Sequence, residues 1–327
     1  MRRRDFIIAL GGAAASWPLT TRAQQQPMPV IGILNGRGAN EAPELLAAFR
    51  QGLSESGFVE GQNVAIEYRF AEHQNERLPA LASELAGRKV TVIAATNTAA
   101  AVAAKAATTS IPIVFAIAGD PVQLGLVASL NRPGGNVTGL TQLALDVIPK
   151  RLELLRQLLP AATTVALLVN PSNRFLAEPQ IHDLQAAAPM LGLKMHVVTA
   201  GSEQDFEDVF ARLKQLRVTG LVIGEDTVFT SHSGELALAC ARHAMPAIYD
   251  SREFVAAGGL VSYGGSHTDA YYMAGVYTAR ILKGEKPADL PVQQRTKVQL
   301  LLNLTAAKAL GISVPLPLLG RADEVIE

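Results

Sequence analysis

The sequence predicts an α/β chain of two similar lobes, each a parallel sheet with helices on both faces. Short apolar runs alternate with helical stripes along the 327 residues, a pattern typical of βαβ units. The landmarks of this pattern then recur in the same order. Asn35 and Asn170, which each end a strand-like run, lie 135 positions apart, and Pro112 and Pro246, which each open one, lie 134 apart. A nearly constant offset indicates that one topology is duplicated.

In the first half, apolar runs that end in polar residues predict strands, and apolar residues spaced three and four apart predict helices. Gly57 and Gly87 close two of these helices, as glycine commonly does. The expected elements are Val30–Leu34, Glu44–Ser56, Val64–Tyr68, Leu78–Leu85, Val90–Ala95, Ala99–Ala107 and Pro112–Ile117.

The same criteria apply to the second half, where strands and helices again alternate. Gly192 closes the first of its helices. The expected elements are Val165–Val169, Glu178–Leu191, Leu193–Val198, Phe206–Leu216, Gly220–Ile223, Ser233–His243, Pro246–Tyr249, Thr268–Leu282, Lys297–Asn303 and Thr305–Leu310.

The stretch Gly119–Leu140 completes the first lobe and leads to the second. Asp120 followed by Pro121 predicts a helix start, because aspartate caps helices and proline suits the first helical position. This helix is expected to end near Asn131, before Pro133 and two glycines. A short strand should follow, and the chain should then leave for the second lobe.

The pairs Gly134-Gly135 and Gly258-Gly259 each open the last expected strand of a half. This makes Val137–Leu143 and Val261–Ser266 candidate hinge segments, with a third crossing around Pro291–Lys297. The domains so predicted are residues 28–140 plus 264–294 for the N-terminal lobe, and 141–263 plus 295–327 for the C-terminal lobe.

Residues 1–23 are typical of an export signal. Arg2-Arg3-Arg4 is followed by a short apolar run, and Thr21-Arg22-Ala23 offers a cleavage site. The adjacent arginines, with Phe6 two residues on, resemble a twin-arginine signal; a basic amphipathic helix is the alternative. The only cysteine, Cys240, is far from this site and cannot carry a lipid there. We therefore expect a periplasmic protein without a lipid anchor, cleaved after about Ala23.

Charge and cysteine content exclude several classes of protein. Basic and acidic residues balance at 29 each, and without residues 1–23 they number 25 and 28. Because basic residues are not in excess, the charge gives no indication of a nucleic-acid partner. A single cysteine permits no disulfide within the chain and excludes a two-cysteine racemase.

Polar residues stand at the expected strand ends. In an open parallel sheet, ligands bind beyond the carboxyl ends of the strands, and two facing lobes would bring both sets into one cleft. The candidate ligand-binding residues are Asn35, Thr96, Asn97, Thr98, Asp120, Asn170, Ser172, Asn173, Asp226, Thr227, Tyr249 and Tyr263.

The chemistry of this set suits an amphipathic ligand with a charged head group. Thr96-Asn97-Thr98 precedes an alanine-rich helix whose free N–H groups would suit a carboxylate. Asp226 stands at the matching place in the second half and would suit an ammonium group. Helix capping by Thr96, Thr98 or Asp226 is the alternative in each case, and for Asp120 capping is favoured over contact.

Catalytic and cofactor motifs are missing from the sequence. Gly36-Arg37-Gly38 has Glu41 where a dinucleotide fingerprint needs its third glycine, and the six histidines show no metal-ligand spacing. Cys240 lies within an expected helix and reads as a small buried residue. We therefore expect no enzyme, no cofactor and no metal.

Five segments together resemble the tryptophan/tyrosine-type substrate-binding proteins of ABC transporters. They are Phe49–Gly57, Gly119–Gly139, Asn170–Asn173, Gly258–Gly264 and Ile281–Val292. The resemblance covers about Pro29–Glu327 and implies a type I periplasmic-binding fold that closes on its ligand about a hinge of several crossovers. In relatives that bind aromatic amino acids, turns at the places of Thr96–Thr98 and Asp226-Thr227 hold the head group. Thr227 stands here where those relatives have Asn, and Gly265-Ser266 where a Pro-Asp or Ile-Asp pair is common.

The expected function is that of the periplasmic solute-binding component of an ABC importer. Its ligand would be an aromatic or branched amino acid or an aromatic carboxylate, and its partners a permease and an ATPase, with the chain itself a monomer. Two alternatives remain open: a ligand-sensing ectodomain that serves a receptor, and a secreted two-lobed enzyme.

Overall fold

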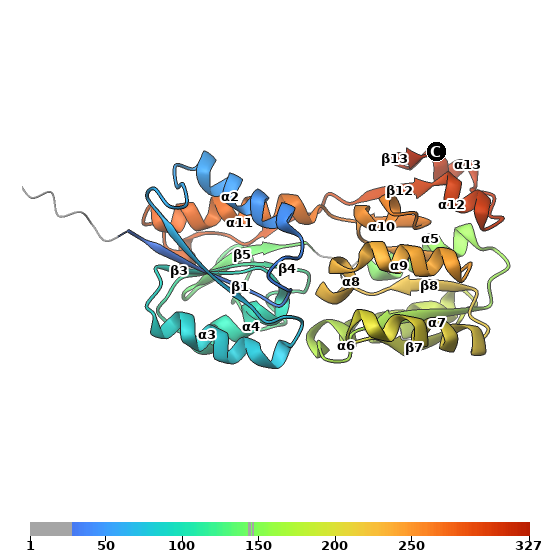
Figure 1. The fold of residues 1–327 in the computed structure, drawn as a ribbon, viewed down its shortest axis with the longest axis horizontal. Coiled ribbons are helices and arrows are strands. Elements are labelled where there is room, and N and C mark those ends of the chain that lie inside the picture. The colour runs from blue at the N-terminus through green and yellow to red at the C-terminus, as the bar shows by residue number, and fades with distance from the viewer. Residues whose placement is uncertain (1–27, 143–144, 146) are drawn as a thin grey trace, which may run out of the picture.

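The computed structural model describes residues 28–142, 145 and 147–327 (Figure 1). The predicted export signal, residues 1–23, lies outside the described residues, as does Leu143 at the end of one predicted hinge segment. Among the helices in these ranges, none is both long and apolar enough to cross a membrane.

The first sheet holds six parallel strands in the order β11-β5-β4-β3-β1-β2. Its strands are β1 (Val30–Asn35), β2 (Ala65–Phe70), β3 (Val92–Ala95), β4 (Ile113–Ile117), β5 (Val137–Thr141) and β11 (Gln293–Gln294). One face packs against α2 (Pro43–Glu55) and α11 (His267–Leu282), and the other against α3 (Leu78–Gly87) and α4 (Thr98–Ala107). Burial on both faces explains why β1, β3 and β4 read as continuous apolar runs, whereas the partly buried edge strand β2 alternates.

The second sheet holds seven strands in the order β13-β12-β10-β9-β8-β6-β7. Its strands are β6 (Thr164–Val169), β7 (Lys194–Thr199), β8 (Gly220–Ile223), β9 (Ala247–Tyr249), β10 (Val261–Gly264), β12 (Gln299–Asn303) and β13 (Glu324–Ile326). The β10–β12 pair is antiparallel, and the other neighbours are parallel.

Helices cover both faces of the second sheet as well (Figure 1). The helices on one side are α7 (Phe206–Gln215), α8 (Thr227–Ser231), α9 (Ser233–Arg242) and α10 (Arg252–Ala256). Those on the other side are α5 (Ile148–Leu158), α6 (Arg174–Met190), α12 (Leu304–Ala309) and α13 (Leu316–Leu319). Three short 3₁₀ turns complete the described elements: η1 (Asn75–Arg77), η2 (Glu203–Asp205) and η3 (Pro287–Asp289).

The predicted duplication is visible in the strand order. The first lobe runs β2-β1-β3-β4-β5 and the second β7-β6-β8-β9-β10, so equivalent strands occupy equivalent places. The chain passes between the sheets after β5, after β10 and after β11, which are the places predicted for crossings. The α/β class with two parallel-dominated lobes is confirmed.

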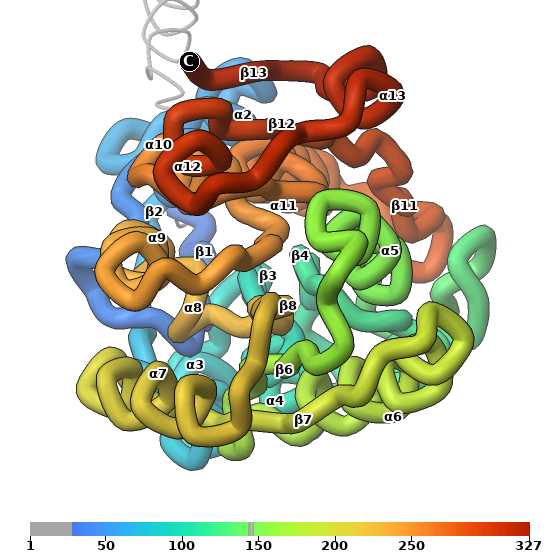
Figure 2. Tube along the Cα trace, turned by 90° about the vertical axis from the view of Figure 1, so that its right-hand side faces the viewer, coloured from blue at the N-terminus to red at the C-terminus, as the bar shows by residue number. Residues whose placement is uncertain are grey.

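The C-terminal segment extends beyond the last helix that the sequence predicts. After α12, the chain forms α13 and β13, and β13 pairs with β12. Viewed from the end of the molecule, this red segment lies along one side of the second lobe (Figure 2).

The helix predicted from Asp120 to Asn131 is wrong, because the structure has only turns there. Asp120 does accept hydrogen bonds from the backbone N–H groups of Val122 and Gln123, at 2.7 and 3.3 Å. However, Gly125 adopts a left-handed φ of +67° and ends the first turn before a helix can propagate. An Asp-Pro start is common to turns and helices, and it does not distinguish them.

Helices α2 and α11, far apart in sequence, pack backbone against backbone. A Cβ atom placed at Gly275 would lie 2.2 Å from the Phe49 carbonyl oxygen, and one at Gly52 would lie 2.0 Å from that of Tyr272. The absence of side chains at these glycines therefore sets the distance between the helices. This contact fixes α11, which enters the first lobe from the second.

Candidate ligand-binding site between the lobes

A narrow cavity lies between the lobes, at the carboxyl ends of the strands of both sheets, where open α/β sheets place their ligands. Its polar lining residues come from both halves of the chain: Arg37, Thr96–Thr98, Gln142, Asn173, Glu225–Thr227, Thr230, His267 and Tyr271. Ala116, Ile117, Ala118 and Leu176 add apolar surface. Six predicted site residues are part of this lining: Thr96, Asn97, Thr98, Asn173, Asp226 and Thr227.

Asn35 organises the wall of the first lobe from behind the cavity lining. Its side-chain amide donates to the Thr96 hydroxyl at 2.8 Å and to the Tyr271 hydroxyl at 2.9 Å. Its side-chain oxygen accepts the backbone N–H of Arg37 at 2.9 Å. Asn35 is only 2 % exposed, so it positions three lining residues, of which two follow β1 and β3 and one lies on α11.

The N-terminus of α4 points at the cavity and carries an unused hydroxyl. Asn97 caps the helix by accepting the backbone N–H of Ala100 at 2.8 Å, so the capping alternatives for Thr96 and Thr98 are wrong. The Thr98 hydroxyl is buried and has no hydrogen-bond partner among the described residues. A buried hydroxyl without a partner is costly, so the Thr98 hydroxyl needs an explanation beyond the packing of α4.

Asp226 forms the opposing wall, where it is 2 % exposed. Its carboxylate accepts the backbone N–H of Val228 at 2.9 Å, the Asn170 amide at 2.9 Å and the Asn173 amide at 2.7 Å. Asp226 is therefore both the cap of α8 and a lining residue. Burial raises the pKa of Asp226 above its usual value, although the hydrogen bonds from Asn170, Val228 and Asn173 lower it in part.

A buried charge cluster stands beside Asp226. Arg151 on α5 is fully buried, and its Nη2 atom lies 4.0 Å from carboxylate oxygens of both Glu225 and Asp250. Asp250 also contacts His267, with 3.1 Å between Oδ2 and Nε2. Burial and repulsion from Asp250 raise the pKa of Glu225 well above its usual value. Burial opposes ionisation of Asp250, but Glu225, His267 and Arg151 together lower its pKa.

The remaining predicted residues do not line this cavity. Asn170 lies behind Asp226 and also accepts the backbone N–H and the hydroxyl of Ser172, at 3.0 and 2.8 Å. Ser172 and Asp120 instead line a wider groove at the side of the lobe interface, between α3, α4 and α6.

Two tyrosines of the predicted site do not line the cavity, and their rings pack into the core of the second lobe. Tyr249 is fully buried, packs edge-on against Phe254, and its hydroxyl contacts that of Thr230 at 3.0 Å. Tyr263 packs against the core under α5, and its carbonyl accepts Nε–H of Arg151 at 2.8 Å.

Several lining residues are not among the candidates that the sequence predicts. Arg37 has a signal, since it follows β1 by two residues, but its Gly-Arg-Gly context resembles part of a nucleotide motif. Glu225 directly precedes Asp226 and is one of the polar residues expected at that strand end, although it is not among the candidate ligand-binding residues. His267 and Tyr271 have no local signal, because α11 returns from the other lobe.

The expected burial of Cys240 is confirmed, at 4 % exposure. Burial raises the pKa of its thiol to about 12, so the thiol is protonated and unreactive at neutral pH.

The profile of the family described as ABC transporter substrate binding protein matches residues 30–326. The chain belongs to this family. It is a family of substrate-binding proteins, and its members are typically extracytoplasmic. The family assignment agrees with the resemblance that the five sequence segments carry.

Individual relatives extend the comparison. A tyrosine-binding protein of Clostridioides difficile (strain R20291) is 28% identical over 269 residues, which are 81% of this chain and 75% of the relative. An ABC domain from Streptococcus pneumonia in complex with L-Trp is 24% identical, with a TM-score of 0.80 over 91% of this chain and 99% of that one. A substrate-binding protein with adhesive properties from Clostridium difficile, in its ligand-free open form, is 27% identical. It has a TM-score of 0.62 over the same shares, 91% and 99%. The type I periplasmic-binding fold of this substrate-binding protein is thereby confirmed.

Proposed function

We propose that this substrate-binding protein serves an ABC importer and binds an aromatic or branched amino acid, or an aromatic carboxylate. The observation that carries the proposal is the pairing of a buried, unpartnered Thr98 hydroxyl at the α4 N-terminus with the Asp226 carboxylate across one cavity. The first suits a ligand carboxylate and the second a ligand ammonium group.

The proposed head-group residues are Thr96, Asn97, Thr98, Asp226 and Thr227. Arg37 adds a cation for the carboxylate, since it lines the same cavity. The apolar part of the ligand would contact Ile117, Leu176 and the Tyr271 ring. The relatives that bind tyrosine and L-Trp support this ligand class.

We propose that the lobes close on the ligand about the three crossings. The domains would be residues 28–140 plus 264–294 and residues 141–263 plus 295–327. Higher similarity to the L-Trp complex than to the ligand-free open form, with TM-scores of 0.80 and 0.62, supports a closed arrangement here. A direct contact across the lobes supports it too: the Arg37 guanidinium donates to the Ser231 hydroxyl at 2.8 Å.

The mature chain would act as a monomer in the periplasm and deliver its ligand to a permease with its ATPase. Its export would use the arginine-rich segment at residues 2–4. Cell fractionation of the chain with Arg3→Lys and Arg4→Lys together tests this, and continued export of the double variant would contradict a twin-arginine route.

A set of matched ligands tests the binding proposal. L-Tryptophan has both charged groups, tryptamine lacks the carboxylate, and indole-3-propionate lacks the ammonium group. We expect L-tryptophan to raise the melting temperature most. The only tryptophan of the chain, Trp17, lies in the predicted signal, so the indole fluorescence of the ligand can be followed without tryptophan background from the mature chain. If amino acids and aromatic acids leave the melting temperature unchanged while a nucleotide or a sugar raises it, the ligand class is wrong.

A further inference from the structure

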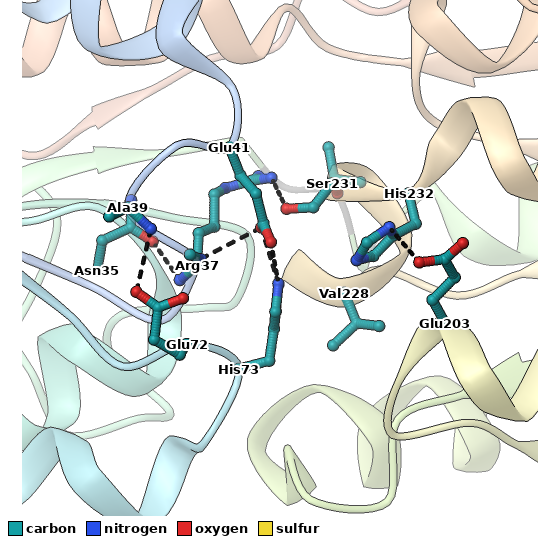
Figure 3. Close-up of polar contacts among 12 residues, drawn as sticks. Asn35, Arg37, Ala39, Glu41, Glu72, His73, Glu203, Val228, Ser231 and His232 are labelled. Atoms are coloured by element: carbon teal, nitrogen blue, oxygen red, sulfur yellow. Dashed lines mark hydrogen bonds and ion pairs between the residues drawn. The ribbon is translucent and has the colours of Figure 1, made fainter.

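Two histidines from different lobes face each other beside the cavity (Figure 3). His73 follows β2 in the first lobe, and His232 stands between α8 and α9 in the second. Their ring centroids are 5.7 Å apart. Glu41, just before α2, completes a group that we call the rim cluster: Glu41, His73 and His232. The cluster lies outside the amino-acid site proposed above and has no part in it.

The donor atoms of the rim cluster are close enough to share one ion. Nε2 of His73 lies 2.7 Å from Oε2 and 2.9 Å from Oε1 of Glu41. One ligand atom from each of the three residues lies within 4.8 Å of the other two. Two imidazoles and one carboxylate form a donor set that zinc uses in proteins, with a fourth position left for water. Calcium and magnesium prefer sets made only of oxygen.

The backbone holds His73 in a conformation that is costly for an ordinary residue. Glu72 and His73 have φ values of +52° and +61°, in the left-handed region. The backbone N–H of His73 donates to the Gly36 carbonyl at 2.8 Å and keeps the turn in place. Strained residues of this kind concentrate at functional sites, and here the strain directs an imidazole to the lobe interface.

The other two members of the rim cluster are also oriented by neighbours. Glu41 accepts the backbone N–H of Gly38 at 3.2 Å. Nδ1 of His232 lies 3.6 Å from Glu203, which leaves its Nε2 edge toward His73 (Figure 3). A carboxylate behind a histidine is the usual outer partner of a metal-binding imidazole, because it fixes the orientation of the ring.

The charges around the rim cluster favour a cation. Glu41, Glu72 and Glu203 lie in this region, with Arg37 as the guanidinium beside them (Figure 3), and Glu235 adds a fourth carboxylate near His232. Arg37 is directed to the Ser231 hydroxyl rather than to the Glu41 carboxylate. The Glu41 carboxylate, which also takes a hydrogen bond from Ser231, is therefore not paired with this guanidinium.

We propose that Glu41, His73 and His232 bind a divalent transition-metal ion, with Zn²⁺ as the best match. Because the ligands come from both lobes, the ion would join the lobes when they are closed. A second-lobe set of Glu203, His232 and Glu235, whose ligand atoms also lie within 4.8 Å of one another, is the competing location. This competing set has one imidazole, whereas the rim cluster has two, and it does not involve His73.

Calorimetric titration of ZnCl₂ into the metal-stripped mature chain tests the site. We expect one tightly bound equivalent, which His73→Asn and His232→Asn each remove. Asparagine is chosen because it tolerates the left-handed backbone at position 73. His243→Asn is the matched control, since its imidazole also pairs with a glutamate, Glu207, at 3.2 Å. It should keep the equivalent.

Two further measurements make the assignment specific. Glu203→Gln should weaken Zn²⁺ binding by roughly 10–100-fold, as loss of an outer-shell carboxylate does. Co²⁺ bound to the wild-type chain should give the visible absorption of a four-coordinate ion, and His73→Asn should abolish it. The proposal is overturned if the wild-type chain binds no Zn²⁺, or if His73→Asn binds it as tightly as His243→Asn does.

Closure of the lobes can be measured separately, and an ion bound within one lobe would not cause it. Zn²⁺ should reduce the radius of gyration of the ligand-free chain in solution scattering, and His73→Asn should not respond. Zn²⁺ binding without compaction would contradict a bridging ion. These experiments contain no amino acid, so their outcome is separate from that of the proposed amino-acid function.

Discussion

Replacement of Asp226 by asparagine separates the binding role of this residue from its structural role. The Asp226 carboxylate accepts three hydrogen bonds, from Val228, Asn170 and Asn173. Asparagine has one oxygen at the same place. If this oxygen takes the bonds from Val228 and Asn170, the new NH₂ group faces the Asn173 amide, and one buried donor loses its partner.

Two contributions to the change in stability of Asp226→Asn have opposite signs. An unsatisfied buried donor costs about 1–3 kcal/mol. Burial raises the pKa of Asp226, so removal of the charge recovers part of the cost of burying it. We therefore expect a net loss of about 1 kcal/mol, or about 2–4 °C in melting temperature for a domain of this size.

The effect on binding should be larger than the effect on stability. Loss of one partner from a buried charge pair costs about 2–5 kcal/mol. At 1.4 kcal/mol per tenfold, the affinity for L-tryptophan should fall by about 30-fold or more in Asp226→Asn. The affinity for indole-3-propionate, which has no ammonium group, should remain near that of the wild-type chain.

Calorimetry with both ligands on the wild-type chain, Asp226→Asn and Asp120→Asn provides the measurement. Asp120→Asn is the matched control, because Asp120 caps a turn and lines the side groove rather than the cavity. An unchanged affinity of Asp226→Asn for L-tryptophan would remove Asp226 from the site. An equal loss for both ligands would mean that the residue shapes the cavity and does not bind an ammonium group.

Three further outcomes are expected. Gly275→Ala should destabilise the fold by about 1–3 kcal/mol in urea unfolding, because its Cβ meets the Phe49 carbonyl oxygen at 2.2 Å, whereas Gly87→Ala, with open space around it, should not. Arg151→Met should cost about 3–5 kcal/mol in the same assay, since it leaves buried carboxylates without their cation, and a neutral result would show that the cluster is self-sufficient. The affinity for L-tryptophan should fall as the pH is lowered through the raised pKa of Asp226, because the protonated acid cannot pair with the ammonium group; a profile that Asp226→Asn leaves unchanged would contradict this.

The sign of the pH effect on the ligand-free chain is opposite to that on binding. Since burial raises the pKa of Asp226 above 3.8, the folded chain holds this proton more tightly than the unfolded chain. The contribution of Asp226 to stability is therefore greatest at low pH and is lost as the pH rises through its folded pKa. A bound ammonium group would reverse this trend, because it favours the charged carboxylate. Stabilisation by L-tryptophan should therefore grow as the pH rises through the raised pKa of Asp226.

The sheets and half of the polar cavity lining could be predicted because both follow from local pattern. Strands such as β3 and β8 are buried on both faces and read as apolar runs, and the residues after them, Thr96 and Asp226, mark the carboxyl ends. The side-chain packing of Tyr249 has no such signature. A tyrosine at a strand end can face a ligand or the core, and only the surrounding helices decide.

Other features depend on contacts between distant parts of the chain. His73 and His232 come from loops of different lobes, so no spacing rule for metal ligands could connect them. The turns after Asp120 depend on Gly125 adopting a left-handed conformation, which the sequence permits but does not require.

The buried Arg151 cluster connects the cavity wall to a crossing between the lobes. Arg151 holds the Tyr263 carbonyl near the end of β10, and Asp250 holds His267 at the start of α11. Glu225 of the same cluster lines the cavity. Apolar residues in place of the whole cluster, unlike Arg151→Met alone, could fill this volume at less cost in desolvation, so stability alone does not account for these charges. Their arrangement instead fixes the direction in which the chain leaves β10. Because Glu225 belongs to the cluster, this constraint acts directly beside Asp226.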